Sequence, residues 1–217
     1  LEPMPDSSHS EATKEAIAQL RKATDRSATA LILMDGLEEE GEWSGARILA
    51  EMTLQDPSLA LTPAHKAEFA YRAGAAAEVE GDDGAAERWL GVALEAEPGH
   101  RGALLAIGNR RYRSGDYEES ERCYRTLLAR HRDTLDPAIR AEAHFRLAGL
   151  YQQAGGATGN AQVALEKALS SLPTHRAARK ALIELHRTAA AWEKVAEHQR
   201  RLVDLSEGAE RREQALI

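Results

Sequence analysis

Eight histidines and one cysteine are the residues of this 217-residue sequence with the most obvious potential for chemistry. A zinc-protease site needs two helical histidines at a one-turn spacing with a glutamate between them, and a structural zinc site usually needs paired cysteines. Neither spacing occurs. We predict no catalytic residue, no cofactor and no metal site, and an unreactive thiol at Cys123 inside a helix. The histidines are His9, His65, His100, His131, His144, His175, His186 and His198.

Two glycine-rich segments resemble binding loops but lack the necessary partners. Residues 80–84 are acidic, yet the alternating ligands and the distal glutamate of a calcium loop are missing. Residues 155–159 contain three glycines, but no lysine follows as a phosphate-binding loop requires. Both segments are therefore predicted to be turns between helices. His100 and His175 follow closely after a proline and are predicted to lie in exposed turns, whereas His144 and His186 are expected to pack.

The composition indicates which elements carry these residues. Hydrophobic residues make up 43% of the chain but aromatic residues only 5%, and much of the apolar content is alanine. Such a composition favours packed helices over sheets. One cysteine excludes an internal disulfide framework, and the sequence shows neither a signal segment nor an apolar run long enough to cross a membrane. We expect no membrane association and a cytoplasmic setting, with the chain being a fragment of a larger protein.

A short turn recurs along the chain at intervals typical of helical repeats. The glycines at its centre are Gly41, Gly81, Gly115 and Gly155, and Ala190 takes the same place in a fifth turn. A helical pattern precedes each turn and another follows it. Two helices in each period of about 34–40 residues predict a solenoid of helical hairpins.

The repeats resemble the tetratricopeptide repeat family, whose unit is a helix–turn–helix of about 34 residues. Residues 67–100 carry the family's small and large residues in order, as do 101–134 and 141–175, while 27–60 and 176–209 fit more loosely. In residues 67–100 the matching residues, with small residues in place of bulky ones in the first helix, are Ala70, Ala73, Gly74, Ala77, Ala86, Leu90, Ala93 and Pro98. The resemblance implies an all-α, right-handed superhelix of about five hairpins plus flanking helices.

Other segments complete the predicted layout of a single helical domain over residues 11–217. Residues 1–10 are expected to be a disordered leader, residues 11–25 a helix that caps or continues the stack, and residues from 210 the start of a truncated sixth hairpin. Thr62 before Pro63, and Asp136 before Pro137, are typical helix starts and predict two lengthened first helices.

In the family that this chain resembles, the first helix of each repeat lines a concave groove. Helical spacing then projects one set of positions from each repeat into it. We predict partner contacts from the more distinctive of them, which run from an acidic entrance through an aromatic centre to a mixed basic exit. These residues are Leu31, Asp35, Glu38, Tyr71, Leu105, Asn109, Tyr112, Phe145, Gln152, Lys180 and Arg187.

The sequence therefore predicts a non-catalytic scaffold or adaptor that binds a peptide or protein, with possible self-association through the solenoid ends. Two alternatives remain open. An arginine-rich third repeat could bind nucleic acid, although a solvated face or pairing with the acidic N-terminal half fits better, since residues 1–100 carry a net charge of −12 and residues 101–217 of +5. The array could also regulate an attached enzyme domain.

Overall fold

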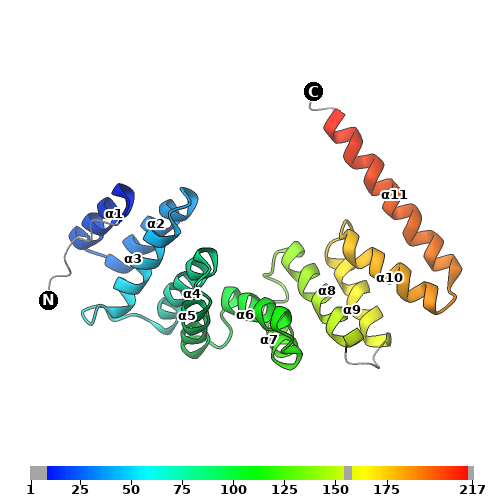
Figure 1. The fold of residues 1–217 in the computed structure, drawn as a ribbon, viewed down its shortest axis with the longest axis horizontal. Helices are drawn as coiled ribbons and strands as arrows, with labels where there is room; N and C mark the ends of the chain where they lie inside the picture. Colours follow the sequence, from blue (N-terminus) through cyan, green and yellow to red (C-terminus); the bar gives the residue numbers. More distant parts are fainter. Residues whose placement is uncertain (1–8, 154–157, 215–217) are drawn as a thin grey trace. The chain divides into compact units, whose positions relative to one another are not determined.

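The computed structural model describes residues 9–153 and 158–214, and within these ranges it contains eleven α-helices and no strand (Figure 1). The all-α prediction is thereby confirmed. In chain order the helices are α1 (Glu11–Lys22), α2 (Arg26–Glu39), α3 (Trp43–Gln55), α4 (Pro63–Glu80), α5 (Asp83–Ala96), α6 (Arg101–Ser114), α7 (Tyr117–Arg130), α8 (Pro137–Gln153), α9 (Thr158–Ser171), α10 (Arg176–Thr188) and α11 (Trp192–Gln214).

The chain forms two compact units, Leu1–Arg110 and Arg111–Ile217. In the first unit α1 packs against α2 and α3, α2 packs against α3, α3 against α4, and α4 against α5. In the second unit α7 packs against α8, α8 against α9, α9 against α10, and α10 against α11. In these pairs, helices that are consecutive in the chain are neighbours in space, as stacked hairpins require.

The turns within four of the hairpins share one backbone geometry. Gly41, Gly81 and Gly115 have φ values of +79°, +77° and +81°, and Ala190 has φ +53°. In each case the next residue donates its N–H to the carbonyl five positions back, at 2.7 to 2.9 Å. This is the helix-ending motif that favours glycine, because glycine has no Cβ to oppose the left-handed conformation. The predicted turns are confirmed at these positions, while the one at Gly155 lies outside the described residues.

The two predicted helix starts are also confirmed. The Thr62 hydroxyl accepts a hydrogen bond from the His65 N–H at 3.2 Å, and the Asp136 carboxylate accepts one from the Ala138 N–H at 2.7 Å. A proline occupies the first position of α4 and of α8. These helices have 18 and 17 residues, compared with 13 or 14 in the first helices of the other hairpins, so the extra segments lengthen them as expected.

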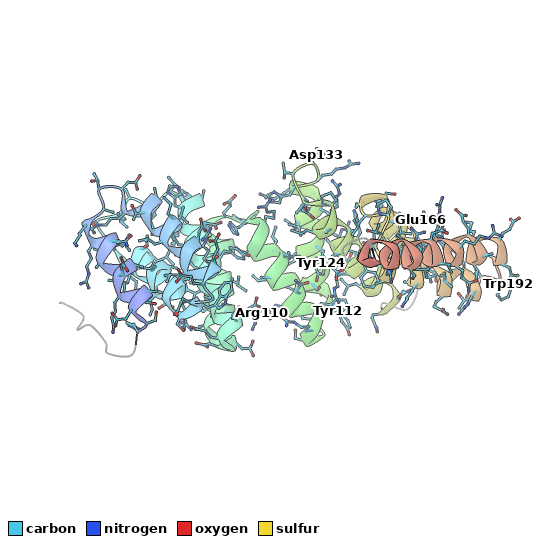
Figure 2. The ribbon with its side chains drawn as sticks, turned by 90° about the horizontal axis from the view of Figure 1, so that it is seen from above. Arg110, Tyr112, Tyr124, Asp133, Glu166 and Trp192 are labelled. Atoms are coloured by element: carbon cyan, nitrogen blue, oxygen red, sulfur yellow. The ribbon has the colours of Figure 1, made fainter. Side chains whose placement is uncertain are left out.

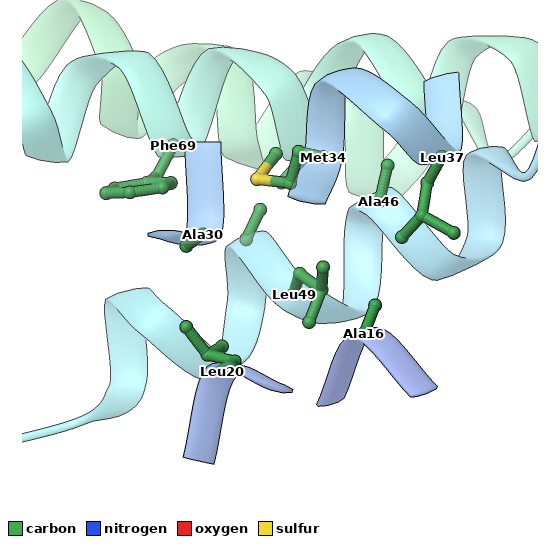
Figure 3. Packing of buried hydrophobic residues seen from close by; sticks show 10 residues of the cluster. Ala16, Leu20, Ala30, Met34, Leu37, Ala46, Leu49 and Phe69 are labelled. Atoms are coloured by element: carbon green, nitrogen blue, oxygen red, sulfur yellow. The ribbon is translucent and has the colours of Figure 1, made fainter. Parts of the chain in front are cut away.

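Helix α1 belongs to the core of the first unit. Ala16 and Leu20 from α1 pack with Met34 and Leu37 from α2 and with Leu49 from α3 in one buried cluster (Figure 3). The prediction that residues 11–25 form a helix extending the stack is confirmed. Burial of large aliphatic side chains such as these contributes about 1.5–3 kcal/mol each.

Small residues permit the close approach of helices that the repeat pattern predicts. Gly74, Ala86, Ala148 and Ala161 are all buried. A Cβ at Gly74 would lie only 2.8 Å from Cγ of Leu90. Helices α4 and α5 therefore approach each other too closely here for any residue larger than glycine. Gly74 and Ala86, which match small positions of the repeat pattern, therefore lie in the packed interior.

The C-terminal helix differs from the prediction. α11 continues without interruption from Trp192 to Gln214, so the turn that would open a sixth hairpin at residue 210 is absent from the described residues. No proline occurs between 192 and 214, and the single glycine there, Gly208, costs only about 1 kcal/mol in a helix. Of the expected leader, residues 1–8 lie outside the described residues, whereas Ser10 caps α1 through the Thr13 N–H.

Candidate functional site

Several predicted groove residues of the first unit gather around one pocket. This pocket, of about 450 Å³, lies between α2, the start of α3, and α4. Glu38 and Tyr71, two of the predicted groove residues, line it, and Glu68, Ala75 and Glu78 from the same face of α4 join them. The sequence missed the other lining residues. The full lining is Glu38, Trp43, Glu68, Tyr71, Arg72, Ala75, Glu78 and Val79.

Arg72 is the cation at the centre of this acidic site. Its Nη1 lies 2.5 Å from the Asp35 carboxylate and 3.5 Å from that of Glu38, and its Nε lies 2.9 Å from Glu68. The Arg72 side chain is only 18% exposed. One guanidinium thus holds together three carboxylates from α2 and α4, and the site keeps an excess of negative charge.

The carboxylates of this site have shifted pKa values. Partial burial raises the pKa of Glu38, Arg72 opposes that rise, and the neighbouring charges of Asp35 and Glu68 add to it. The pKa of Glu68 is lowered to about 2, chiefly by its hydrogen bond with His100, and further by Arg72. The charge on Glu38 is therefore poorly compensated within the chain, while that on Glu68 is well compensated.

His100 and His175 are not in exposed turns, which corrects the sequence prediction. Both side chains are only 11% exposed. The Nδ1 of His100 accepts from the Ala103 N–H and that of His175 from the Ala178 N–H, so each ring caps the helix that follows it. With Nδ1 accepting, Nε2 carries the proton and donates to a glutamate, Glu68 for His100 at 3.1 Å and Glu142 for His175 at 3.2 Å.

An aromatic ring completes each of these clusters. Tyr71 lies 5.1 Å from His100 between ring centroids, and Phe145 lies 5.2 Å from His175, both pairs with an interplanar angle of 44°. The sequence pattern behind them is Glu-x-x-aromatic-Arg in one first helix, followed by Pro-x-His just before the next first helix. It occurs at 68–100 and again at 142–175. This repeated pattern could have identified the clusters from the sequence.

Two of the predicted groove aromatics pack on glycines of the next first helix. A Cβ added at Gly102 would clash with the ring of Tyr71, and one added at Gly149 would lie 2.8 Å from the Tyr112 hydroxyl. Both rings are half-buried. Part of each aromatic surface is thus committed to contacts between consecutive first helices, and the remainder is exposed.

The other predicted residues are distributed as follows. Leu31 is half-buried and packs against the hydrophobic cluster of α1 to α3. Leu105 and Asn109 on α6 are half-buried. In the second unit Gln152, Lys180 and Arg187 are exposed, with Arg187 paired to Glu184 at 2.8 Å.

The arginines of the third repeat are largely occupied by carboxylates of the chain. Arg110 pairs with Glu78 at 3.2 Å and with Asp83 at 2.9 Å, which confirms the expected pairing with the acidic N-terminal half. Other arginines pair within α7, namely Arg122 with Glu119 and Arg125 with Glu121. These pairs reduce the positive charge that this repeat could offer to phosphates.

The thiol has the environment expected from the sequence. Cys123 is buried, and burial is the main cause that raises its pKa to about 12, so it is a protonated thiol at neutral pH. In the part of the chain that the structure describes, no three His, Cys, Asp or Glu side chains gather as a metal site. None of the helices described combines the length and apolarity needed to cross a membrane.

Comparison with known proteins identifies the fold. No protein-family model and no curated protein sequence matches this chain. Among solved structures, MamA 41-end from Desulfovibrio magneticus RS-1 is 17% identical, with a TM-score of 0.66 over 85% of this chain and 97% of that chain. BtubC from P. vanneervenii is 16% identical, with a TM-score of 0.70 over 92% of this chain and 88% of that chain. The predicted helical repeat fold is confirmed by these likenesses.

Proposed function

We propose that this chain is a tetratricopeptide-type, non-catalytic module that binds a segment of another protein through the face formed by its first helices. In the first unit the pocket around Arg72 takes a basic side chain of that segment. The observation that carries this proposal is the pocket itself, which is lined from α2 and α4 by Glu38, Glu68 and Glu78, with Arg72 as the cation among them.

The chemistry of the pocket favours a cationic group. A lysine or arginine side chain would supply the positive charge that Glu38 lacks, and its attraction would offset the desolvation that raises the pKa of Glu38. The uncharged part of the lining is aromatic and apolar. Trp43 and Tyr71 can contact the cationic group, and Val79, which is 58% exposed, can contact the aliphatic part of the lysine or arginine side chain.

A peptide-binding measurement on the full chain tests this proposal. The probes are two fluorescent dodecapeptides of equal apolar content, one alternating lysine with leucine and the other glutamate with leucine. We expect the basic peptide to bind and Glu38→Gln to weaken its binding by about fivefold, whereas Glu38→Gln should not weaken any binding of the acidic peptide. Glu15→Gln on α1, an exposed residue that removes the same charge, is the matched control and should bind as the unmodified chain does.

Binding of the basic peptide that Glu38→Gln leaves unchanged would overturn the assignment of the pocket.

A second variant tests the aromatic part of the face in the second unit. Tyr112→Ala combined with Phe145→Ala should abolish capture of a natural partner and leave helicity unchanged by circular dichroism. Unimpaired capture by this double variant would remove the aromatic residues from the binding face.

A further inference from the structure

A second cleft lies in the second unit, away from the predicted groove. Two adjacent pockets, of about 610 and 490 Å³, lie along α8 between α7 and α9 and have Leu128, His144 and Lys167 in common. We call the two pockets together the α7–α9 cleft. Its further lining residues are Glu121, Arg125, Ala129, Arg132, Asp133, Arg140, Leu147, Tyr151, Asn160, Val163, Ala164, Ser170 and Ser171.

One end of the α7–α9 cleft is basic. Arg132, Arg140 and Lys167 line it, with Asp133 as the carboxylate among them. Arg140 is held in place because its Nε donates to the Ser171 hydroxyl at 3.2 Å and its Nη1 donates to the Arg132 carbonyl at 2.8 Å. These two hydrogen bonds fix the orientation of the guanidinium, and its remaining N–H groups can donate to an anion.

The positive field of this end acts on a histidine at the cleft floor. His144 on α8 is half-buried, and its pKa is lowered to about 4 by burial, by Lys167 and by Arg140. The imidazole is neutral at physiological pH and adds no charge of its own. An anionic ligand would therefore meet the three cations next to a neutral ring.

The other end of the α7–α9 cleft is apolar. Leu147, Tyr151 and Ala164 line it, and Val163 exposes 48% of its surface there. Arg125 at this end is already paired with Glu121 at 3.1 Å. A ligand that fills the whole cleft would need an apolar group beside an anionic one.

The cleft opens on the side of α8 away from the predicted groove residues. At about 100° per residue, Arg140, His144 and Leu147 share one face of α8, while Phe145 and Gln152 lie roughly 120–140° around the helix from Arg140. Figure 2 shows Asp133, just after the end of α7, and Tyr112, just before its start, near opposite ends of that helix. A ligand of the cleft and a ligand of the groove would not compete for the same surface.

We propose that the α7–α9 cleft is a second protein-docking site, which takes an acidic segment of a partner with its carboxylates on Arg132, Arg140 and Lys167 and an apolar side chain on Val163 and Tyr151. Charge complementarity selects the occupant. Glu121 and Asp133 interrupt the positive surface, so a continuous phosphate backbone fits it less well than separate carboxylates on a peptide.

Fluorescence polarisation with the full chain tests this site. The probes are the glutamate–leucine dodecapeptide, a glutamate–serine dodecapeptide of equal charge, and a fluorescent decamer of oligouridylate. The variant Arg132→Gln with Lys167→Gln removes two exposed cations for which no side-chain hydrogen bond or ion pair is seen in the described residues. Lys194→Gln with Arg200→Gln on α11 removes two exposed cations outside the cleft and is the matched control.

We expect the glutamate–leucine peptide to bind, the cleft variant to weaken it by about tenfold, and the control variant to leave it unchanged. The glutamate–serine peptide should bind about fivefold more weakly, since it lacks the apolar side chain. Absence of binding, equal loss in the two variants, or tighter binding of oligouridylate than of the acidic peptide would each overturn the proposal.

Discussion

The two units contain the same arrangement of side chains with different electrostatics. Glu68, Tyr71 and His100 in the first unit correspond to Glu142, Phe145 and His175 in the second, with nearly equal distances in both. An arginine follows the aromatic residue in each case, Arg72 in the first unit and Arg146 in the second. The glutamate, the aromatic ring and the histidine form a common framework, and the surroundings of the arginine differ.

In the first unit the arginine faces carboxylates, whereas in the second it faces a ring. Arg72 contacts Asp35 and Glu38 on α2 in addition to its own Glu68. Arg146 pairs with Glu142 at 2.7 Å, and its guanidinium lies 5.2 Å from the ring centroid of Tyr112. Tyr112 stands at the same place in the sequence relative to Arg146 as Glu38 does relative to Arg72. The same scaffold therefore gives an acidic surface in one unit and an aromatic one in the other, through the residues of the preceding first helix.

Among the variants, replacement of the two arginines should give the largest difference in the free energy of unfolding between the two environments. Arg72→Met leaves three carboxylates together without a cation, so we expect a loss of about 2–3 kcal/mol in the free energy of unfolding at pH 7. Arg146→Met removes one ion pair and one cation–π contact and should cost about 1 kcal/mol. Urea denaturation of both variants measures the difference. Equal losses would contradict the contrast, and adding Glu38→Gln to Arg72→Met should restore part of the stability.

The units should also respond to acid in different pH windows. His144 in the second unit has a pKa lowered to about 4, so it binds fewer protons folded than unfolded, and stability falls as the pH falls from about 6.5 to about 4. His198, whose pKa burial also lowers, acts in the same direction. Glu68 in the first unit, with a pKa of about 2, loses its contribution only as the pH falls from about 4.5 to about 2. The raised pKa of Glu38 acts above that window, because protonation of Glu38 adds stability as the pH falls toward 4.5.

Hydrogen exchange resolved by peptide measures these windows. Between pH 7 and pH 5 we expect the free energy of opening to fall for amides of α8 and α9. In His144→Gln this fall should be smaller by about 1–2 kcal/mol. Amides of α4 should keep their protection over the same range. Simultaneous loss of protection in α4 and α8 above pH 5 would show that the two units do not titrate separately.

The sequence predicts the fold better than the site because the two depend on different kinds of information. Turn glycines such as Gly81, and caps such as Thr62, act on their own segment, so their structural effect is local and can be predicted from the sequence. The clustering of Asp35 with Arg72 depends on how two helices face each other, which single positions do not specify. The prediction for His100 is wrong because the residues after a proline commonly form an exposed turn, whereas here the ring folds back to cap the next helix.

The shared framework predicts similar effects of histidine replacement in the two units. Asn is a good helix cap, so His100→Asn and His175→Asn should keep the N-terminal cap and lose only the bond to glutamate and the ring contact. We expect a loss of about 1 kcal/mol in each case, and about 1 kcal/mol more for the corresponding alanine variants. Thermal unfolding of the four variants measures this. A cost confined to one histidine would mean that the frameworks are not equivalent.

The smallest expected effect concerns a turn in which the two units differ. Gly81 ends α4 in the left-handed conformation without strain, whereas Ala190 ends α10 in the same region with φ +53° and a Cβ that opposes it. Ala190→Gly should therefore stabilise the second unit by about 0.5–1 kcal/mol, and Gly81→Ala should destabilise the first by about 1 kcal/mol. Denaturation midpoints of the two variants, compared with Gly91→Ala on α5, where an added Cβ meets nothing within 4 Å, separate turn strain from helix propensity. If Ala190→Gly lowers stability, the entropy of the unfolded chain outweighs the strain at this turn.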